Sequence, residues 1–216
     1  MNWSYRLVDC MCGIIQSLTA NLLVVHHYCG TSKGGSRFQD SGFRACSPHN
    51  CVCGKLVDAR DLHGLSCRRS TPRHQCHAML NDIIWRSIKR AQIPTHKEPT
   101  GLVSQEGKRP DGVTMIPWAS GKPLAWDVTV PDTYAESHII STSAIKTTKY
   151  LDITSTHIFY PISIETAGSW DVQAVELMEE MGRHTTAATN DQNGTMYLFQ
   201  RISMAIQRGN DLSHIQ

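Results

Sequence analysis

The stretch KRPDGVTMIPWASGKPLAWDVTV, residues 108–130, decides the fold that this chain adopts. It holds two runs that favour β structure, RPDGVTMIPW and KPLAWDVTV, and the Gly-containing segment ASGK joins them. Two such runs around a short turn predict an antiparallel hairpin. Each run also carries one aspartate, Asp111 or Asp127, and an acid inside a strand is a local misfit. Their presence on neighbouring strands therefore indicates a function for the pair.

Periodic apolar residues on either side of this hairpin predict the remaining elements. Leu80, Ile84 and Ile88 recur along one face of a helix that Pro94 closes. The predicted elements, in order, are helix 77–92, an extended segment 95–103, the two strands of the hairpin, helix 142–153, a buried strand 157–166, helix 171–189 and a last helix within 196–211 that ends at Gly209. A hairpin followed by a crossover helix and another strand gives an α/β fold (α+β with a mixed sheet) with helices packed on the sheet.

The composition fits one sizeable globular domain with a small appendage. Of the 216 residues, 40% are hydrophobic and 19% are charged, which is not typical of a disordered chain. No apolar run reaches the length of about 20 residues that spans a bilayer, so we expect no membrane partner. The formal net charge is only +2, which does not by itself indicate nucleic-acid binding but is compatible with a local basic surface.

Eight cysteines lie in the first 76 residues, and the rest of the chain has none. The N-terminal apolar run is interrupted by Gln16, Ser17, Thr19 and Asn21, which is not typical of a cleaved signal peptide. We therefore expect a reducing, intracellular environment. In such an environment, clustered cysteines are candidate metal ligands rather than a disulfide framework.

Cys51, Cys53, His63 and Cys67 have the spacing C-x-C, nine residues, then H-x-x-x-C. Four nitrogen and sulfur ligands in a short segment match a structural zinc site, which would order a segment too small to fold on its own core. C-x-C is tighter than the usual C-x-x-C, so the alternative is a set of reduced, inert cysteines beside a surface histidine. The substitute ligands are Cys46, His49, His74, Cys76 and His77.

Basic residues follow the cysteine cluster directly. Arg68, Arg69 and Arg73 stand in the segment CRRSTPRH. Beside a zinc module, such side chains could hold a phosphate backbone, which makes them candidate nucleic-acid contacts. The alternative is a solvated run of charge.

Two carboxylates on adjacent strands converge on one divalent cation when the sheet brings them together. Mg²⁺ prefers carboxylate oxygen together with water and phosphate oxygen, and it lowers the pKa of attacking water. Lys146 follows on the next predicted helix, with Lys149 and Tyr150 three and four positions further on. The alternatives are ordinary turn chemistry at RPDG, a solvent-facing Asp127 on an edge strand and a solvated helix face at KTTKY.

Several motifs after residue 50 together resemble a known family. In order, they are CVCG, LHGLSC, LNDIIWR, KEPTGL, KRPDGVTMIPW, AWDVTV, KTTKY and YLFQRIS. The pattern of RPDG, WDVTV and K-x-x-K-Y resembles the PD-(D/E)xK superfamily of restriction endonucleases. Residues 51–208 are similar to the C-terminal zinc knuckle and restriction-enzyme-like endonuclease region of non-LTR retrotransposon reverse transcriptase polyproteins.

The resemblance implies roles for the candidate site residues. Asp111 and Asp127 would bind Mg²⁺ or Mn²⁺, and Lys146 would replace the lysine that other members of the superfamily carry where Thr129 stands. The accessory candidates are Lys149, Tyr150 and the additional acid Glu98. The resemblance implies a CCHC zinc knuckle at 51–76 and a restriction-endonuclease-like domain at 77–216. Residues 1–50 lie outside the resemblance, and their Gly- and Ser-rich segment predicts a poorly specified, partly disordered leader.

The activity implied is hydrolysis of a DNA phosphodiester to leave a 3′-hydroxyl, with RNA as the alternative partner and the nucleus as the site of action. The segment between WDVTV and KTTKY is shorter than in the family, which would shift Lys146 relative to the acids. The alternative is therefore a catalytically inactive remnant that still binds nucleic acid. A third alternative is an interaction protein that keeps the fold without a ligand.

Overall fold

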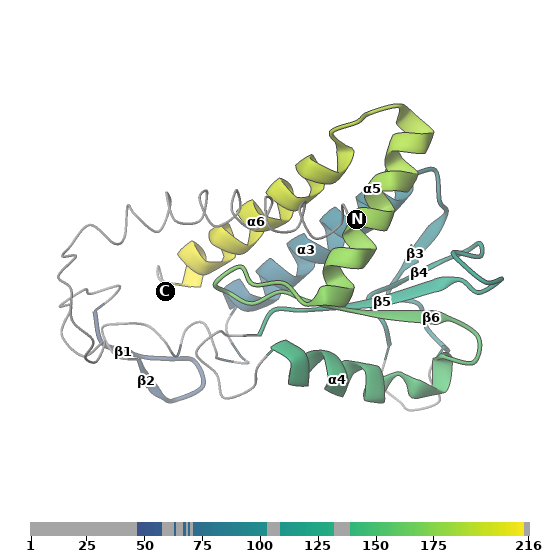
Figure 1. Ribbon diagram of the computed structural model, residues 1–216. Helices are drawn as coiled ribbons and strands as arrows, with labels where there is room; N and C mark the ends of the chain where they lie inside the picture. Colours follow the sequence, from purple (N-terminus) through teal and green to yellow (C-terminus); the bar gives the residue numbers. More distant parts are fainter. Residues whose placement is uncertain are drawn as a thin grey trace, which may run out of the picture.

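The computed structural model describes residues 47–57, 63, 67, 69, 71–102, 109–131 and 139–213. Its centre is a four-stranded sheet in the order β3-β4-β5-β6, and a separate two-stranded sheet pairs β1 with β2 (Figure 1). The strands are β1 His49–Asn50, β2 Leu56–Val57, β3 Thr95–Lys97, β4 Gly112–Thr114, β5 Leu124–Thr129 and β6 Ile158–Ser163. Most of the leader expected at 1–50 lies outside the described residues.

The strand directions make the larger sheet a mixed one, as the sequence predicts. β3 pairs with β4 and β4 with β5 in antiparallel fashion, whereas β5 and β6 are parallel. Gly112 is opposite Trp126 in the β4–β5 pair, which confirms the hairpin predicted around ASGK. A parallel pair requires a crossover connection, and α4 (Ile139–Lys149) supplies it, followed by the short 3₁₀ helix η1 (Leu151–Ile153).

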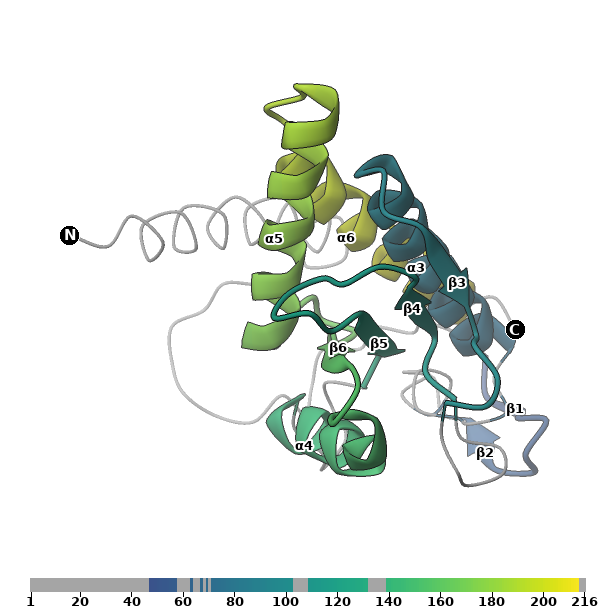
Figure 2. The ribbon, with the colours of Figure 1, turned by 90° about the vertical axis from the view of Figure 1, so that its right-hand side faces the viewer.

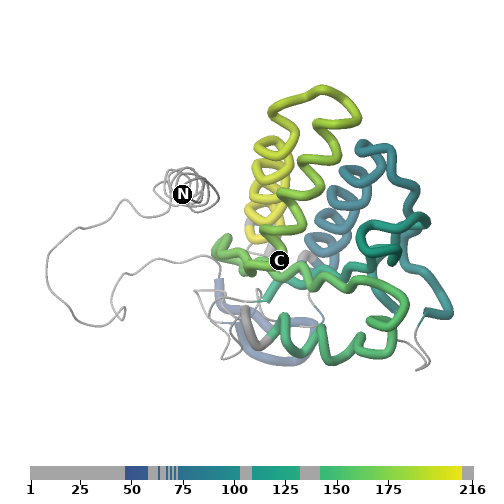
Figure 3. Tube along the Cα trace, turned by 45° about the vertical axis from the view of Figure 1, so that its right-hand side comes forward, coloured from purple at the N-terminus to yellow at the C-terminus, as the bar shows by residue number. Residues whose placement is uncertain are grey.

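Helices cover both faces of the sheet. The helices α3 (Thr71–Arg90), α5 (Val172–Thr189) and α6 (Gly194–Ser213) lie on one face and α4 on the other (Figures 1 and 2). In the tube view the yellow-green pair α5 and α6 stands beside α3 (Figure 3). None of the helices in the described part of the chain is both long enough and apolar enough to cross a membrane.

The larger core fills the space between the sheet and the three helices α3, α5 and α6. Its fully buried side chains include Leu80, Ile84, Ile88, Leu124, Trp126, Ile162, Leu177, Met178, Met181 and Ile202. The apolar face predicted for α3 is thereby confirmed.

Successive residues of β5 point to opposite faces of the sheet. Alternate residues of the strand join the larger core, namely Leu124, Trp126 and Val128. Ala125 instead packs in a smaller cluster with Tyr150 on the α4 side of the sheet. Asp127 shares the direction of Ala125, so the alternation of the strand aims its carboxylate toward α4.

Several helix limits differ from the sequence predictions. α3 begins at Thr71 rather than at residue 77, because the polar segment TPRHQC contributes one apolar residue and little periodic signal. The domain boundary expected between residues 76 and 77 therefore falls within α3. The helix predicted at 142–153 is α4, which ends at Lys149 and is followed by η1.

α6 continues to Ser213, and the helix end predicted at Gly209 is wrong. Gly209 lies where α6 packs against α3, and a Cβ added there would be 2.5 Å from the Cys76 Sγ. The glycine thus permits two helices to approach closely and does not end the helix.

Gly112→Ala should lower the free energy of unfolding by about 1–3 kcal/mol. A Cβ at this position would overlap the six-membered ring of Trp126, which is fully buried and cannot move without disturbing the core. Urea denaturation measures the effect. Gly194→Ala is the control, because its Cβ would lie 3.4 Å from the nearest atom of Thr185. Equal stability of the two variants would contradict this account.

Candidate functional site

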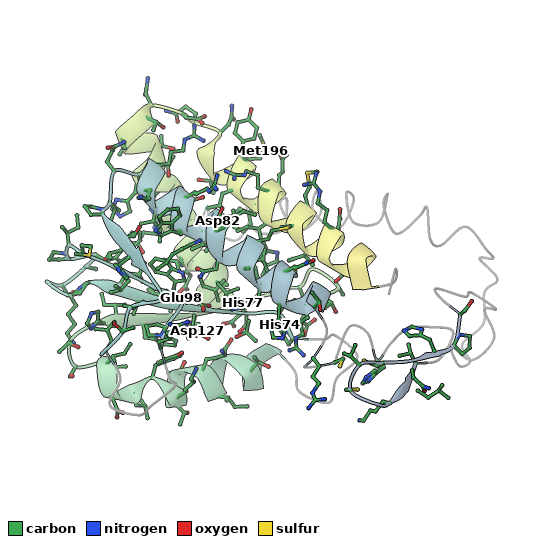
Figure 4. All side chains as sticks on the ribbon, turned by 180° about the vertical axis from the view of Figure 1, so that it is seen from behind. His74, His77, Asp82, Glu98, Asp127 and Met196 are labelled. Atoms are coloured by element: carbon green, nitrogen blue, oxygen red, sulfur yellow. The ribbon has the colours of Figure 1, made fainter. Side chains whose placement is uncertain are left out.

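Asp111 and Asp127 come together at the edge where β4 begins. Asp111 immediately precedes β4, and its backbone N–H donates to the Trp126 carbonyl at 2.9 Å. Asp127 follows Trp126 in the central strand β5, so the two aspartates lie on neighbouring segments of one sheet. Figure 4 labels Asp127 together with His77 of α3 and Glu98, which follows β3.

Asp127 is an acid buried inside an apolar strand, with 4% of its surface exposed. Its Oδ2 forms an ion pair with the Nζ of Lys146, from the last turn of α4. Its Oδ1 accepts a hydrogen bond from the Tyr150 hydroxyl at 2.9 Å. Since a buried charge is tolerated only when it is paired and hydrogen-bonded, these two partners account for its position. The alternative of a solvent-facing aspartate on an edge strand is wrong.

Tyr150 links the acid to the chain before Asp111. Its hydroxyl lies 2.6 Å from the Arg109 carbonyl as well as 2.9 Å from Asp127, and it accepts from the Lys149 Nζ at 2.7 Å. Burial, and next the charge of Asp127, raise the pKa of Tyr150 well above its usual value. The hydroxyl therefore stays protonated and acts as a neutral donor.

Among the described residues, the hydrogen bonds to the Asp111 carboxylate all end on one oxygen. Its Oδ2 accepts from the backbone N–H of Val128 at 2.6 Å and from the His77 Nε2 at 3.1 Å. The hydrogen bond to Asp111 raises the pKa of His77, against the opposing effect of burial. The Asn81 amide, one turn further along α3, donates to the Asp111 carbonyl at 3.3 Å.

Two of these contacts come from residues that the sequence reasoning did not assign to the acid pair. The sequence pattern marks His77 only as a substitute zinc ligand, and it gives no role to Asn81. Both are polar residues four positions apart, so they share one face of α3 with each other. Asn81 is buried beside Leu80 and Ile84, and a polar residue between two positions of the apolar stripe was the available signal.

Glu98 is placed beside Asp111 by its backbone and not by its carboxylate. Its N–H donates to the Asp111 carbonyl at 2.9 Å, whereas its side chain pairs with Arg109 at 2.5 Å and is half exposed. Thr129, two residues after Asp127 in β5, has a buried hydroxyl without a hydrogen-bond partner among the described residues. The additional acid therefore engages an arginine in this structure.

A second cluster lies in the β1–β2 segment and the residues after it. The ligand atoms of Cys51, Cys53, His63 and Cys67 all lie within 4.8 Å of one another. The Cys51 and Cys67 sulfurs are 3.5 Å apart, and the Cys53 Sγ is 3.0 Å from the His63 Nε2. Three thiols and one imidazole are the donor set of a structural zinc site, so this group can bind a metal such as zinc.

The electrostatics of the cluster favour a metal-binding thiolate at Cys53. The pKa of the Cys53 thiol is lowered to about 6, against the effect of burial. The largest cause is a hydrogen bond from the Lys55 backbone, and a hydrogen bond with His63 makes a smaller contribution. Because metals bind the thiolate, a lowered thiol pKa helps binding near neutral pH.

Four of the five substitute ligands lie elsewhere in the described part of the chain. Cys76 is buried against α6, His77 contacts Asp111, and His49 hydrogen-bonds the Ser47 carbonyl. His74 is an exposed residue of α3, and Cys46 lies outside the described residues. Of these residues, the four that the structure describes (His49, His74, Cys76 and His77) do not join the four-residue group.

The basic residues beside the cluster are described in part. Arg69 is exposed, Arg73 is half-buried in the first turn of α3, and Arg68 lies outside the described residues. Arg73 and His77 are four positions apart, so they are neighbours on the helix surface. A basic side chain thus stands one turn from the histidine that contacts Asp111.

Comparison with known proteins gives no assignment, since no protein-family model and no curated protein matches this chain.

The zinc-loaded chain should lose about one equivalent of metal when Cys53 is replaced by alanine, because the remaining three ligands leave the tetrahedral site open. Metal analysis gives the stoichiometry, and Co²⁺ substitution gives the ligand-field bands of a tetrahedral thiolate site. Cys76→Ala removes a cysteine outside the group and should keep the metal. Equal metal content in both variants would rule out this site.

Tyr150→Phe should lower the free energy of unfolding by about 1–3 kcal/mol, because it leaves the Asp127 Oδ1 and the Arg109 carbonyl without the hydroxyl. Urea denaturation at neutral pH measures this loss. Tyr197→Phe is the matched control, since Tyr197 lies on the exposed surface of α6. A stability loss no larger than that of the control would contradict the hydrogen-bond assignment.

Proposed function

We propose that this chain is a metal-dependent DNA endonuclease with a PD-(D/E)xK core and an N-terminal zinc knuckle, of the kind found in non-LTR retrotransposons. The observation that carries the proposal is the convergence of two carboxylates and one ammonium. Lys146 pairs directly with Asp127, and the Asp111 Oδ2 accepts a hydrogen bond from the N–H of Val128, the residue that follows Asp127. These contacts tie Lys146 and Asp111 to neighbouring residues of β5.

The order of elements supports the same proposal. From Thr71 the chain runs helix, strand, strand, strand, helix and strand, which is the order expected of a PD-(D/E)xK core. The sheet places one acid before β4 and the other in β5, and the helix that follows β5 brings the lysine. The motif residues therefore come from the elements that this core would use.

The donor set suits a hard divalent cation. Carboxylate oxygens are the ligands that Mg²⁺ takes together with water and phosphate oxygen, and the Asp111 side chain is 14% exposed, so it is not sealed in the core. Asp111 and Asp127 would hold the ion, which supplies charge stabilisation and lowers the pKa of water.

Lys146 would carry the remaining electrostatic task of the reaction. Its ammonium lies beside Asp127 with 23% of the side chain exposed, so it can reach a water or a phosphate oxygen at the surface of the site. In hydrolysis, a water oxygen bonds to phosphorus while the bond from phosphorus to the 3′-oxygen breaks. The products are a 5′-phosphate and a 3′-hydroxyl, and Lys146 would offset the negative charge that develops.

The contact of Lys146 with Asp127 favours the nuclease over the inactive remnant. The shortened segment between WDVTV and KTTKY was expected to move the lysine away from the acids, and a distant lysine would have indicated a relic. Arg69 and Arg73, with the zinc knuckle, would hold the phosphate backbone of a DNA substrate, which implies action in the nucleus.

Asp127→Asn and Asp111→Asn should each lower the rate of Mg²⁺-dependent nicking of supercoiled plasmid by at least about 100-fold, because an amide is a poor ligand and does not balance the ion's charge. Lys146→Met should lower the rate while leaving metal binding in place.

The matched control for the acids is Asp191→Asn. Asp191 pairs with Arg90 at the turn between α5 and α6 and should not affect nicking. Nicking at the wild-type rate by a folded Asp127→Asn protein would sink the assignment. No nicking by a folded wild-type chain that still retards DNA in a gel would instead support the remnant.

A further inference from the structure

We propose that His77 is a positioning residue of the acid pair: it fixes the Asp111 carboxylate so that one oxygen is presented to a divalent cation. The inference rests on the proposed nuclease function, and it assigns to α3 a part in the site that neither the motifs nor the sheet supply. The support comes from the hydrogen bonds of three groups, namely the His77 imidazole, the Asp111 carboxylate and the Val128 peptide.

These three groups form a closed set of hydrogen bonds. The Val128 N–H donates to the Asp111 Oδ2 at 2.6 Å, and the His77 Nε2 lies 3.1 Å from the same oxygen. The His77 Nε2 also lies 3.2 Å from the Val128 carbonyl oxygen. A carbonyl oxygen only accepts, so Nε2 must carry its proton, which it shares between the two oxygens. The imidazole is therefore a donor to Asp111 in this arrangement.

The Asp111 carboxylate and the His77 imidazole bond the N–H and the carbonyl of Val128, where β4 does not extend far enough to pair with β5. Trp126 and Val128 are two apart in β5, so their peptide groups point to the same side, toward β4. The Trp126 carbonyl accepts from the Asp111 N–H, where the chain of β4 begins. Beyond that point the Asp111 carboxylate and the His77 ring satisfy the Val128 peptide. Asp111 is thus locked to the residue that follows Asp127.

A second residue of α3 prevents the helix from shifting relative to the strands. The Asn81 side chain donates to the Asp111 carbonyl at 3.3 Å and accepts from the Trp126 Nε1 at 3.1 Å. His77 and Asn81, one turn apart, therefore hold the side chain and the backbone of Asp111 respectively. The imidazole is delivered to the carboxylate by a helix that is itself fixed in the core.

This arrangement leaves an oxygen of Asp111 for the ion. Within the described part of the chain, the hydrogen bonds found for the Asp111 carboxylate end on Oδ2. Oδ1 is then the oxygen that can bind a cation, with its direction set by two donors on its twin. Partners that hydrogen-bond a ligating carboxylate typically change metal affinity or activity by about 10–100-fold when they are removed.

A purely structural role for His77 is the competing explanation, because the imidazole also satisfies the Val128 carbonyl. That role predicts lower stability without a specific effect on the cation. The proposed role predicts weaker cation binding, and it predicts recovery when a donor is restored at the same place. Metal affinity and stability must therefore be measured on the same variants.

The test uses the full zinc-loaded chain, with Mn²⁺ binding followed by isothermal titration and with the Mg²⁺ concentration at half-maximal nicking as a second readout. His77→Leu removes the donor, and His77→Gln places an amide donor near the position of Nε2. Gln75→Leu, at an exposed position of the same helix, is the matched control. Asp111→Asn gives the baseline for a damaged site.

We expect His77→Leu to weaken Mn²⁺ binding and to raise the half-maximal Mg²⁺ concentration by about 10–100-fold. His77→Gln should return both values to within a few-fold of the wild type, and Gln75→Leu should match the wild type. If His77→Leu fails to fold by urea denaturation, His77→Asn takes its place, since its shorter amide does not reach the position of Nε2.

Three outcomes overturn the inference. The first is an unchanged Mn²⁺ affinity in His77→Leu. The second is an equal loss of Mn²⁺ affinity in His77→Gln and His77→Leu. The third is that Asp111→Asn leaves the Mn²⁺ binding of the wild type unchanged. Failure of the proposed function gives a different result. If the wild-type chain binds Mn²⁺ through Asp111 but does not nick DNA, the nuclease assignment is wrong and the positioning role of His77 still holds.

Discussion

The burial of the Asp127 charge in the middle of β5 is the constraint on which the rest of the site depends. A carboxylate in an apolar strand costs several kcal/mol unless partners replace its water. Lys146 and Tyr150, at the end of α4, supply those partners, so the crossover helix must lie where it does. A buried ion pair is often no more stable than an apolar replacement. Its presence in the central strand therefore argues for a function beyond stability.

The second acid depends on tight packing on the opposite face of the sheet. Gly112 has no side chain because the Trp126 indole occupies that space, and the indole nitrogen donates to Asn81 of α3. Asn81 in turn donates to the Asp111 carbonyl. The core thus fixes the backbone of Asp111 through one tryptophan and one asparagine, and the position of this acid is a consequence of how α3 packs against β5.

Local patterns were enough to predict the hairpin, the apolar face of α3 and the cysteine and histidine group, because each depends on residues close in sequence. The mixed sheet followed from the order of the elements, since a crossover helix between two strands implies a parallel pair. Long-range contacts were not accessible in this way. Gly209 resembled a helix end, but it permits close contact with Cys76, 133 positions earlier in the chain. Glu98 and His77 likewise have partners that only the folded sheet brings near, namely Arg109 and Asp111.

The location of the lysine has a geometric consequence for the proposed chemistry. A lysine at position 129 would leave from β5 itself, two residues from Asp127 on the same face, and its reach would be set by the strand. Lys146 leaves from α4 instead and ends on the Asp127 Oδ2, an oxygen that a cation would also use. Ion and ammonium would then be close neighbours at that atom, and their like charges would repel each other. Cation binding would therefore direct Lys146 away from the acid and toward the phosphate, where its charge is needed.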